Sequence, residues 1–259
     1  MENQKRFYGW VPDLPDRRDQ MYAAPYKVLQ SLPPKFDLRD QSPCFLPDVY
    51  DQGQLQSCTA NAIAAAIEFD RKKQGLPDFI PSRLFIWANE RIMEHTLDSN
   101  CGASLRDGIK SVVKQGACPE SEWPYDPPKF AVKPPPQCYR DALKDLVTSY
   151  SSLVQNLDQL RGCLFSGYPV IFGFSVYESF ESPEVGQSGI VPMPQPTEAR
   201  VGGHAVVAVG YDDGQQRFVV RNSWGDTWGM KGYCTMPYAY LTDPNLSDDF
   251  WTIRVVSGR

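Results

Sequence analysis

The hydrophobic positions repeat with a helical period in the first half of the chain and gather into short β-rich runs in the second half. Three segments with apolar residues at helical spacing, the first of them Ala-rich, predict helices over residues 58–73, 82–95 and 104–115. A fourth helical stretch is expected near residues 153–164. Runs of β-branched and aromatic residues then predict strands at 170–176, 205–211, 218–221, 232–236 and 251–256. This order predicts an α+β fold, with a helical half followed by an antiparallel sheet or barrel.

Proline is concentrated in three clusters that interrupt these elements. The clusters lie at residues 11–34, 119–136 and 183–196, and proline disfavours any regular element longer than a turn or two. The first cluster predicts an extended N-terminal segment, residues 1–34, that lies on the body of the protein. The second cluster separates a helical unit, residues 35–146, from a β-rich unit, residues 147–259.

The composition is that of a folded protein without a membrane span. Of 259 residues, 42% are hydrophobic and 22% are charged, and no run of about 18 apolar residues occurs. The formal net charge of −5 offers no basic surface to a phosphate backbone, so nucleic acid is not expected as a partner. Residues 1–10 lack the apolar core of a signal peptide. The compartment therefore stays open between the cytoplasm and export with a leader that has been removed.

Cysteine and histidine numbers limit the metal chemistry. The chain has seven cysteines and two histidines, His95 and His204, but no Cys-x-x-Cys pair, so the ligand spacing of a zinc ribbon or zinc finger is missing. We therefore expect no metal site and no cofactor. Because seven is odd, at least one thiol stays free, and up to three disulfide bridges are possible without any one pairing being favoured.

A cysteine, a histidine and an asparagine form a candidate catalytic group. Cys58 stands at the start of the Ala-rich helix, where unpaired N–H groups and the helix dipole favour a thiolate. His204 and Asn222 flank a predicted hairpin whose midpoint falls on Asp213, so the two should face each other to within a residue. A carboxamide there would hold one ring nitrogen and leave the other for a thiol. Taken singly, each residue also has a structural explanation, as an inert buried cysteine, a satisfied histidine and a turn asparagine.

Four sequence blocks resemble the papain-like cysteine proteases. In chain order they are Phe36-Asp37-Leu38-Arg39, Gln52-Gly53 through Ser57-Cys58, Gly203-His204-Ala205-Val206, and Asn222-Ser223-Trp224-Gly225 with Trp228-Gly229 and Gly232-Tyr233. The resemblance implies a papain-like two-lobe fold, with a helical lobe, an antiparallel β-barrel lobe and the active-site cleft between them. Leu55, Gln56 and Thr59 depart from the residues usual beside the family's nucleophile, and such departures resemble its bacterial or viral branch.

The resemblance also implies a role for each matching residue. Cys58 would be the nucleophile, His204 its base and later the acid for the leaving amine, and Asn222 the group that orients the imidazole. Gln52 would supply the side-chain donor of the oxyanion hole, beside the backbone N–H of Cys58. A thiolate–imidazolium ion pair is expected as the active form. Further residues are expected to contact the substrate or shield the site, namely Gly102, Ala103, Ser104, Gly203 and Trp224.

The implied activity is that of a monomeric cysteine endopeptidase, which hydrolyses peptide or protein substrates through a thioester acyl-enzyme. Endopeptidase action is favoured over exopeptidase action because His95 is the only other histidine, so a paired-histidine blocking loop is not available. Two alternatives stay open, an acyl transferase or ligase with the same catalytic residues and a non-enzymatic binding protein on a protease scaffold. The N-terminal segment is expected either to form an arm in or near the cleft or to be simply held on the surface, through residues that include Tyr8, Trp10, Pro12 and Pro15.

Overall fold

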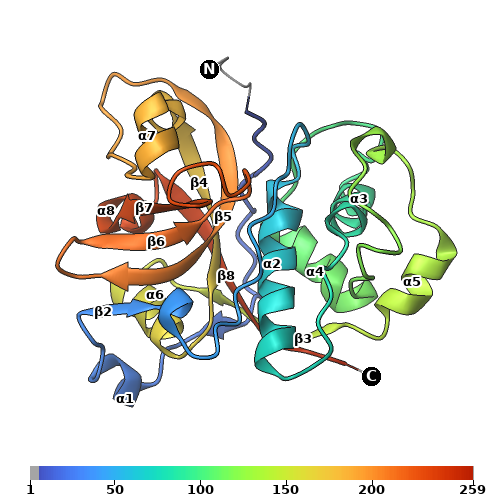
Figure 1. Cartoon of the computed structure of the whole chain (residues 1–259), viewed down its shortest axis with the longest axis horizontal. Coiled ribbons are helices and arrows are strands. Elements are labelled where there is room, and N and C mark those ends of the chain that lie inside the picture. Colours follow the sequence, from blue (N-terminus) through green and yellow to red (C-terminus); the bar gives the residue numbers. More distant parts are fainter. Residues whose placement is uncertain (1–5, 259) are drawn as a thin grey trace.

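Two lobes lie side by side in the computed structural model, and the N-terminal segment runs between them (Figure 1). The structure describes residues 6–258; residues 1–5 and residue 259, at the ends of the predicted N-terminal and β-rich units, lie outside the described residues. One lobe holds helices α2 to α5, and the other holds an eight-stranded sheet with the remaining α-helices. The predicted α+β fold is confirmed.

The helical lobe is built around α2, which spans Cys58–Lys73. Its sequence is Ala-rich and has no internal glycine or proline, and every residue from Cys58 to Arg71 is buried. Ser82 and Ser104 cap the next two helices by accepting backbone N–H bonds, and Gly116, with a φ of 75°, ends the second of them. The other elements of this lobe are α3 (Arg83–Met93), α4 (Leu105–Gln115), η2 (Pro127–Lys129) and α5 (Pro136–Ala142).

The sheet has the strand order β1-β3-β8-β4-β5-β6-β7, and β2 pairs with β5 off this path. β1 and β3 are parallel, and every other pair is antiparallel. The strands are β1 (Met21–Tyr22), β2 (Lys35–Asp37), β3 (Val147–Leu153), β4 (Val170–Tyr177), β5 (Arg200–Asp212), β6 (Arg217–Arg221), β7 (Tyr233–Pro237) and β8 (Ser247–Val256).

The sheet is open, so the barrel expected from the sequence is wrong. No pairing joins the two edge strands, β1 and β7, within residues 6–258. β1 is only two residues long, and the outer edge of β7 is covered by a bridge from Ile190 to Thr235. A short strand at one edge and a covered strand at the other leave the two edges without the ladder that closure requires.

The helix expected near residues 153–164 begins later than predicted. Asn156 caps α6 (Leu157–Phe165) by accepting the backbone N–H groups of Asp158 and Gln159. The residues before it form β3, which pairs with β8. The remaining elements lie on the sheet lobe and are α1 (Tyr26–Leu29), η1 (Leu38–Asp40), η3 (Glu178–Glu181), α7 (Pro183–Ser188) and α8 (Tyr238–Thr242).

The contact between α2 and the sheet joins the two lobes. α2 packs against β5 and β8, so the start of this helix faces the strand that carries His204. The N-terminal extension also docks on the sheet lobe, because β1 pairs with β3 and α1 packs against α6. Among the described residues, no helix combines the length and the apolar character needed to cross a bilayer.

Candidate active site

Cys58 and His204 meet where the first turn of α2 reaches β5. Cys58 is the first residue of α2 and is fully buried, and its Sγ accepts a hydrogen bond from the backbone N–H of Ala205 at 3.3 Å. Ala205 directly follows His204 on β5. The helix start and the strand therefore bring the predicted nucleophile beside the predicted base, although the two residues are 146 positions apart.

His204 and Asn222 are joined by a hydrogen bond of 2.8 Å between Nε2 and Oδ1. The other ring nitrogen, Nδ1, is buried and has no hydrogen-bond partner among the described residues. The predicted strand register is wrong by about two positions, because the turn runs longer than expected and Val207 lies opposite Arg221. Asn222 lies just beyond the end of β6. Strand pairing does not place it opposite His204, but its side chain still reaches the imidazole.

Aromatic rings enclose the imidazole on several sides. Trp224 stacks on His204 with ring centroids 5.0 Å apart and an interplanar angle of 25°, and Phe174 meets the ring edge-on at 5.7 Å. Burial lowers the pKa of His204 to about 4, against a smaller opposing effect from Asn222. Burial likewise raises the pKa of Cys58 to about 12, against hydrogen bonds from Ala205 and Gly9. In the closed site, burial therefore works against the expected thiolate–imidazolium ion pair.

Gln52 is buried, and its carboxamide is held by its neighbours. Its Oε1 accepts a hydrogen bond from Ser223 Oγ at 2.7 Å. Its Nε2 donates to the carbonyl oxygens of Leu55 at 2.9 Å and Phe7 at 3.0 Å. The carboxamide N–H₂ group thus already binds a peptide carbonyl, which is what an oxyanion donor must do.

Two supports of Gln52 were not predicted from the sequence. Ser223 orients the carboxamide, and its position directly after Asn222 in a family block was the available signal. Tyr125 donates its hydroxyl hydrogen to the Gln52 carbonyl at 2.9 Å and also contacts Ser57 Oγ at 2.5 Å. Tyr125 lies in the second proline cluster, and no pattern there pointed to the site.

An arm formed by residues 6–13 fills the space between the lobes. The Trp10 N–H donates to the Gly203 carbonyl at 2.9 Å, and the Val11 N–H donates to the Ala103 carbonyl at 3.1 Å. Ala103 N–H donates in turn to the Gly9 carbonyl at 2.8 Å, which gives a parallel bridge between Trp10 and Ala103. The Gly9 backbone also lies close enough to Cys58 to act on the pKa of its thiol, in the lowering direction. The arm thus contacts both lobes and the candidate nucleophile.

Glycines make room for the aromatic side chains of the arm. A Cβ at Gly173 would lie 2.0 Å from the Trp10 indole, and a Cβ at Gly102 would lie 2.5 Å from the Gly9 carbonyl oxygen. Tyr8 sits edge-on to His204, with ring centroids 5.9 Å apart. Glycine at these positions is therefore explained by close approach of the arm.

The far end of the arm is held by Asp249, which the sequence did not single out. Its Oδ2 accepts the indole N–H of Trp10 at 2.9 Å and the backbone N–H of Asp13 at 2.8 Å. Arg106, on α4, forms an ion pair of 2.7 Å with Asp19 and lies 4.0 Å from Asp13. Burial and the nearby Asp13 carboxylate raise the pKa of Asp249 to about 7.

The predicted substrate-binding residues separate into two groups. Gly102, Ala103 and Gly203 contact the arm in the space between the lobes, and Trp224 stacks on His204. Ser104 is used differently, because its Oγ accepts the Asp107 N–H at 3.2 Å as the cap of α4 and its N–H donates to Glu94 at 2.8 Å. The structure therefore gives Ser104 a helix-capping role.

Comparisons with known proteins agree with this arrangement. The papain family cysteine protease profile matches residues 32–243. An uncharacterized peptidase C1-like protein of Acanthamoeba polyphaga mimivirus is 42% identical, over 97% of this chain and 88% of its own. The crystal structure of xylellain, a cysteine protease from Xylella fastidiosa, is 44% identical, covers 98% of this chain and 99% of its own, and has a TM-score of 0.88.

More distant relatives fall in the same family. A cathepsin B-like protein of Giardia intestinalis is 30% identical over 78% of this chain and 68% of its own. The viral and bacterial relatives, at higher identity, agree with the predicted bacterial or viral branch. With the profile covering most of both lobes, the chain belongs to the papain family of cysteine proteases and is a papain-like cysteine peptidase.

Proposed function

We propose that the protein is a cysteine endopeptidase that hydrolyses peptide bonds by Cys-His-Asn catalysis through a thioester acyl-enzyme. Cys58 is the nucleophile, His204 the general base and acid, and Asn222 the residue that orients the imidazole. The observation that carries the proposal is the bond from His204 Nε2 to Asn222, which leaves Nδ1, beside the α2 start, without a hydrogen-bond partner in residues 6–258. The family membership supports the peptide or protein substrate.

The reaction follows from these positions. Nδ1 of His204 takes the thiol proton as Cys58 Sγ attacks the scissile carbonyl carbon, and the carbonyl oxygen becomes an oxyanion. The side-chain N–H of Gln52 and the backbone N–H of Cys58 bind that oxyanion. His204 then gives its proton to the leaving amine, and water attacks the resulting thioester to release the acid and restore the thiol.

The contact between Gln52 and Phe7 supports the oxyanion role. In the closed site the Gln52 Nε2 group donates to the Phe7 carbonyl oxygen at 3.0 Å. A substrate carbonyl at the same place would exchange one acceptor for another without moving the donor. Ser223 holds the opposite end of the carboxamide, so the N–H₂ group is already oriented before the substrate arrives.

We also propose that the extension, residues 1–34, controls access to the cleft. Its arm hydrogen-bonds Ala103 and Gly203, two residues predicted to contact substrate, and its Gly9 backbone lies near Cys58. A substrate therefore enters only when the arm leaves. Water that enters with the substrate removes the burial that depresses the His204 pKa and raises the Cys58 pKa, so the ion pair forms in the open state.

The proposed organisation places the two catalytic halves in separate units. We propose a helical unit within residues 35–146 that carries Cys58 and a sheet unit, residues 147–259, that carries His204 and Asn222. At the start of the first unit, β2 and η1 lie on the sheet lobe. We propose that one chain is sufficient for activity, because both halves come from the same molecule. Size-exclusion chromatography coupled to light scattering, with activity measured across the peak, checks this point, and activity confined to a dimer would contradict it.

Product analysis tests the activity. Peptides blocked at both termini, incubated with the native chain, are expected to yield two fragments cut at an internal bond, and Cys58→Ala should yield none. Cleavage that removes only terminal residues from unblocked peptides would contradict endopeptidase action. An added amine nucleophile distinguishes the alternative, because a transferase would give mainly the amide product instead of the free acid.

A further inference from the structure

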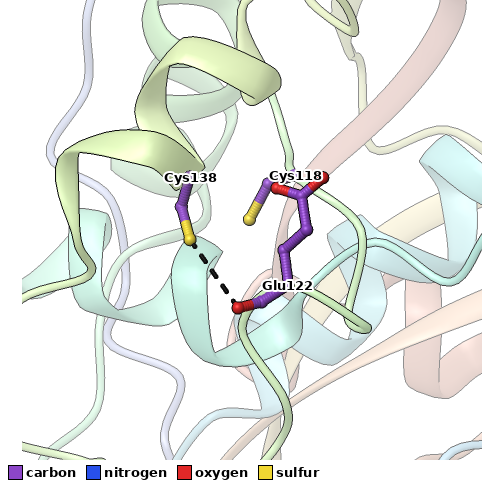
Figure 2. A group of neighbouring side chains, drawn as sticks. All are labelled: Cys118, Glu122 and Cys138. Atoms are coloured by element: carbon purple, nitrogen blue, oxygen red, sulfur yellow. Dashed lines mark hydrogen bonds between the residues drawn. The ribbon is translucent and has the colours of Figure 1, made fainter.

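A second group of reactive side chains lies in the helical lobe, away from the proposed catalytic residues. Cys118 follows α4, Glu122 lies in the next turn, and Cys138 is in the first turn of α5 (Figure 2). One ligand atom from each, the two sulfurs and a carboxylate oxygen, lie within 4.8 Å of one another. Cys118 and Glu122 lie in one loop, whereas Cys138 comes from the start of α5, so the fold brings the third ligand to the other two.

The two cysteines of this group are shielded from solvent. Both side chains are buried, and Figure 2 shows the two sulfurs on the same side of Glu122. Cys138 Sγ donates to the backbone carbonyl of Glu122 at 3.9 Å. Both cysteines are free thiols in the structure, so both sulfurs are available as ligands.

The surroundings of this group are acidic. The carboxylates of Asp141 and Asp145 act electrostatically on Glu122. Lys144 acts in the opposite direction, but its ammonium group is paired with Asp141 at 2.6 Å. Two thiols and several carboxylates thus share one region with little positive charge, which favours binding of a cation.

We propose that Cys118, Cys138 and Glu122 bind one Zn²⁺ ion. Two sulfurs and a carboxylate oxygen are a ligand set that Zn²⁺ accepts, with a water molecule in the fourth position. Tetrahedral Zn–S bonds of about 2.3 Å put two sulfurs about 3.8 Å apart, so the present separation needs to close by at most about 1 Å. Binding releases the two thiol protons and keeps the carboxylate ionised.

Spacing explains why the sequence did not predict this site. The expected zinc motifs place cysteines two residues apart, whereas here Cys118 and Glu122 are four positions apart and Cys138 follows 20 positions after Cys118. The second proline cluster, residues 119–136, fills that interval and turns the chain back so that α5 begins beside Cys118. Only the folded loop brings the third ligand into reach.

A zinc ion here would brace the loop that supports the active site. The Cys118 carbonyl accepts the Ser82 N–H at 2.8 Å, and the Trp123 carbonyl accepts Ser82 Oγ at 2.6 Å, so the loop is fixed to the start of α3. Tyr125, two residues further on, donates to the Gln52 carbonyl. Closing the loop with metal bonds would order Tyr125 and, through it, the backbone of Gln52.

Cobalt titration tests the site with a spectroscopic readout. The full chain is used in a Cys58→Ala background, so that the catalytic thiol cannot bind the metal, and is reduced and treated with a chelator. We expect one Co²⁺ per chain, with two protons released per ion bound, a near-ultraviolet thiolate-to-cobalt charge-transfer band, and displacement of Co²⁺ by Zn²⁺ without further proton release. A stoichiometry near zero, or a spectrum without thiolate bands, would overturn the proposal.

Variants locate the metal. Cys118→Ser and Cys138→Ser should each abolish the charge-transfer band, whereas Cys234→Ser, at another buried cysteine, should leave it unchanged. Glu122→Gln changes an exposed residue, so it tests the site without disturbing the core, and should weaken Zn²⁺ binding on the order of tenfold or more. A band that survives both serine variants would refute the assignment. So would a Cys118–Cys138 disulfide, detected by mass spectrometry, in protein purified with a reductant.

Discussion

Cys58 and Cys163 are both fully buried, but different parts of the molecule cover them. Burial raises the pKa of Cys58 to about 12 and that of Cys163 to about 11. Cys163 lies inside α6 and contacts the Tyr168 carbonyl at 3.8 Å, within the core of the sheet lobe. Cys58 is covered by the arm, whose Gly9 backbone lies close enough to act on the pKa of its thiol. Two equally buried thiols can therefore differ in accessibility. A thiol in the core stays covered while the protein is folded, whereas a thiol under an arm becomes accessible when the arm leaves.

Replacing each of the two cysteines by alanine should give the largest difference in activity between the reactive cysteine and the structural one. Cys58→Ala is expected to lower kcat for peptide hydrolysis by at least about 10⁴-fold, because the nucleophile is lost. Cys163→Ala should leave kcat within about threefold and cost only stability, on the order of 1–2 kcal/mol, through a small cavity. Steady-state kinetics and denaturant unfolding of both variants check this, and comparable losses of kcat would remove the distinction between the two cysteines.

Gln52→Ala should show that Cys58 has an oxyanion donor beside it. Loss of the side-chain N–H is expected to lower kcat on the order of 100-fold with little change in KM, because the oxyanion exists only in the transition state. Gln54→Ala, an exposed change in the same loop, is the matched control and should have no effect. If Gln52→Ala raised KM and left kcat unchanged, Gln52 would be binding substrate in the ground state.

Trp10→Ala should weaken docking of the arm over Cys58 and leave the surroundings of Cys163 unchanged. The indole fills the space over Gly173 and donates to Asp249, and losing about 3 kcal/mol of such contact weakens arm docking roughly 100-fold. We expect kcat/KM toward a fluorogenic peptide to rise by up to that factor, limited by the point at which the arm is mostly open. Leu14→Ala, at a position 83% exposed, is the control. Unchanged kcat/KM in Trp10→Ala would mean that the arm does not limit access.

The contact between Asp249 and the arm should make docking of the arm depend on pH. Its pKa, about 7, is raised by burial and by Asp13, with Asp248 acting in the same direction and the Trp10 and Asp13 N–H groups opposing. Arg106 faces Asp13 from α4 and favours its ionised form. Because the pKa of Asp249 is higher when the arm is docked than when it is released, protonated Asp249 favours docking. The contribution of Asp249 to docking is therefore complete below the ordinary aspartate pKa and is lost as pH rises through about 7.

Arm release should therefore increase between about pH 6 and pH 8. Asp249→Asn keeps an oxygen acceptor for Trp10 but removes the titration, so the ratio of wild-type to variant kcat/KM is expected to rise by several-fold over this interval. Taking the ratio at each pH cancels the titration of the catalytic groups themselves. A ratio that stays constant from pH 6 to pH 8 would exclude Asp249 as the source of pH dependence.

The sequence predicted correctly the helices whose ends are set by neighbouring residues. Ala-rich α2 and the Ser-capped α3 and α4 begin and end within two residues of the predicted positions. β3 was missed because Val-Thr-Ser-Tyr-Ser-Ser-Leu has no apolar alternation, and only pairing with β8 makes it a strand. Whether a sheet closes depends on contacts between its two edges, which lie far apart in the sequence, so the barrel prediction had no local support.

Site residues inside the family sequence blocks were predicted. Residues that reach the site only through long-range contacts of the fold were missed. Cys58, His204 and Asn222 lie in quoted blocks, and the structure brings them together. Asp249 and Tyr125 reach the arm and Gln52 through long-range contacts that no sequence pattern marks. The pKa shifts of the thiol and the imidazole likewise follow from burial in the closed structure, which the motif does not record.

Site-resolved alkylation tests the central claim, that an N-terminal arm reversibly covers a reactive Cys58. Native wild type and Trp10→Ala are treated with iodoacetamide, and peptide mass spectrometry follows Cys58 and Cys163 in the same sample. We predict slow labelling of Cys58 in the wild type, labelling at least about tenfold faster in Trp10→Ala, and none of Cys163 in either until the chain unfolds. Equal Cys58 rates in the two proteins, or labelling of both cysteines at one rate, would contradict it.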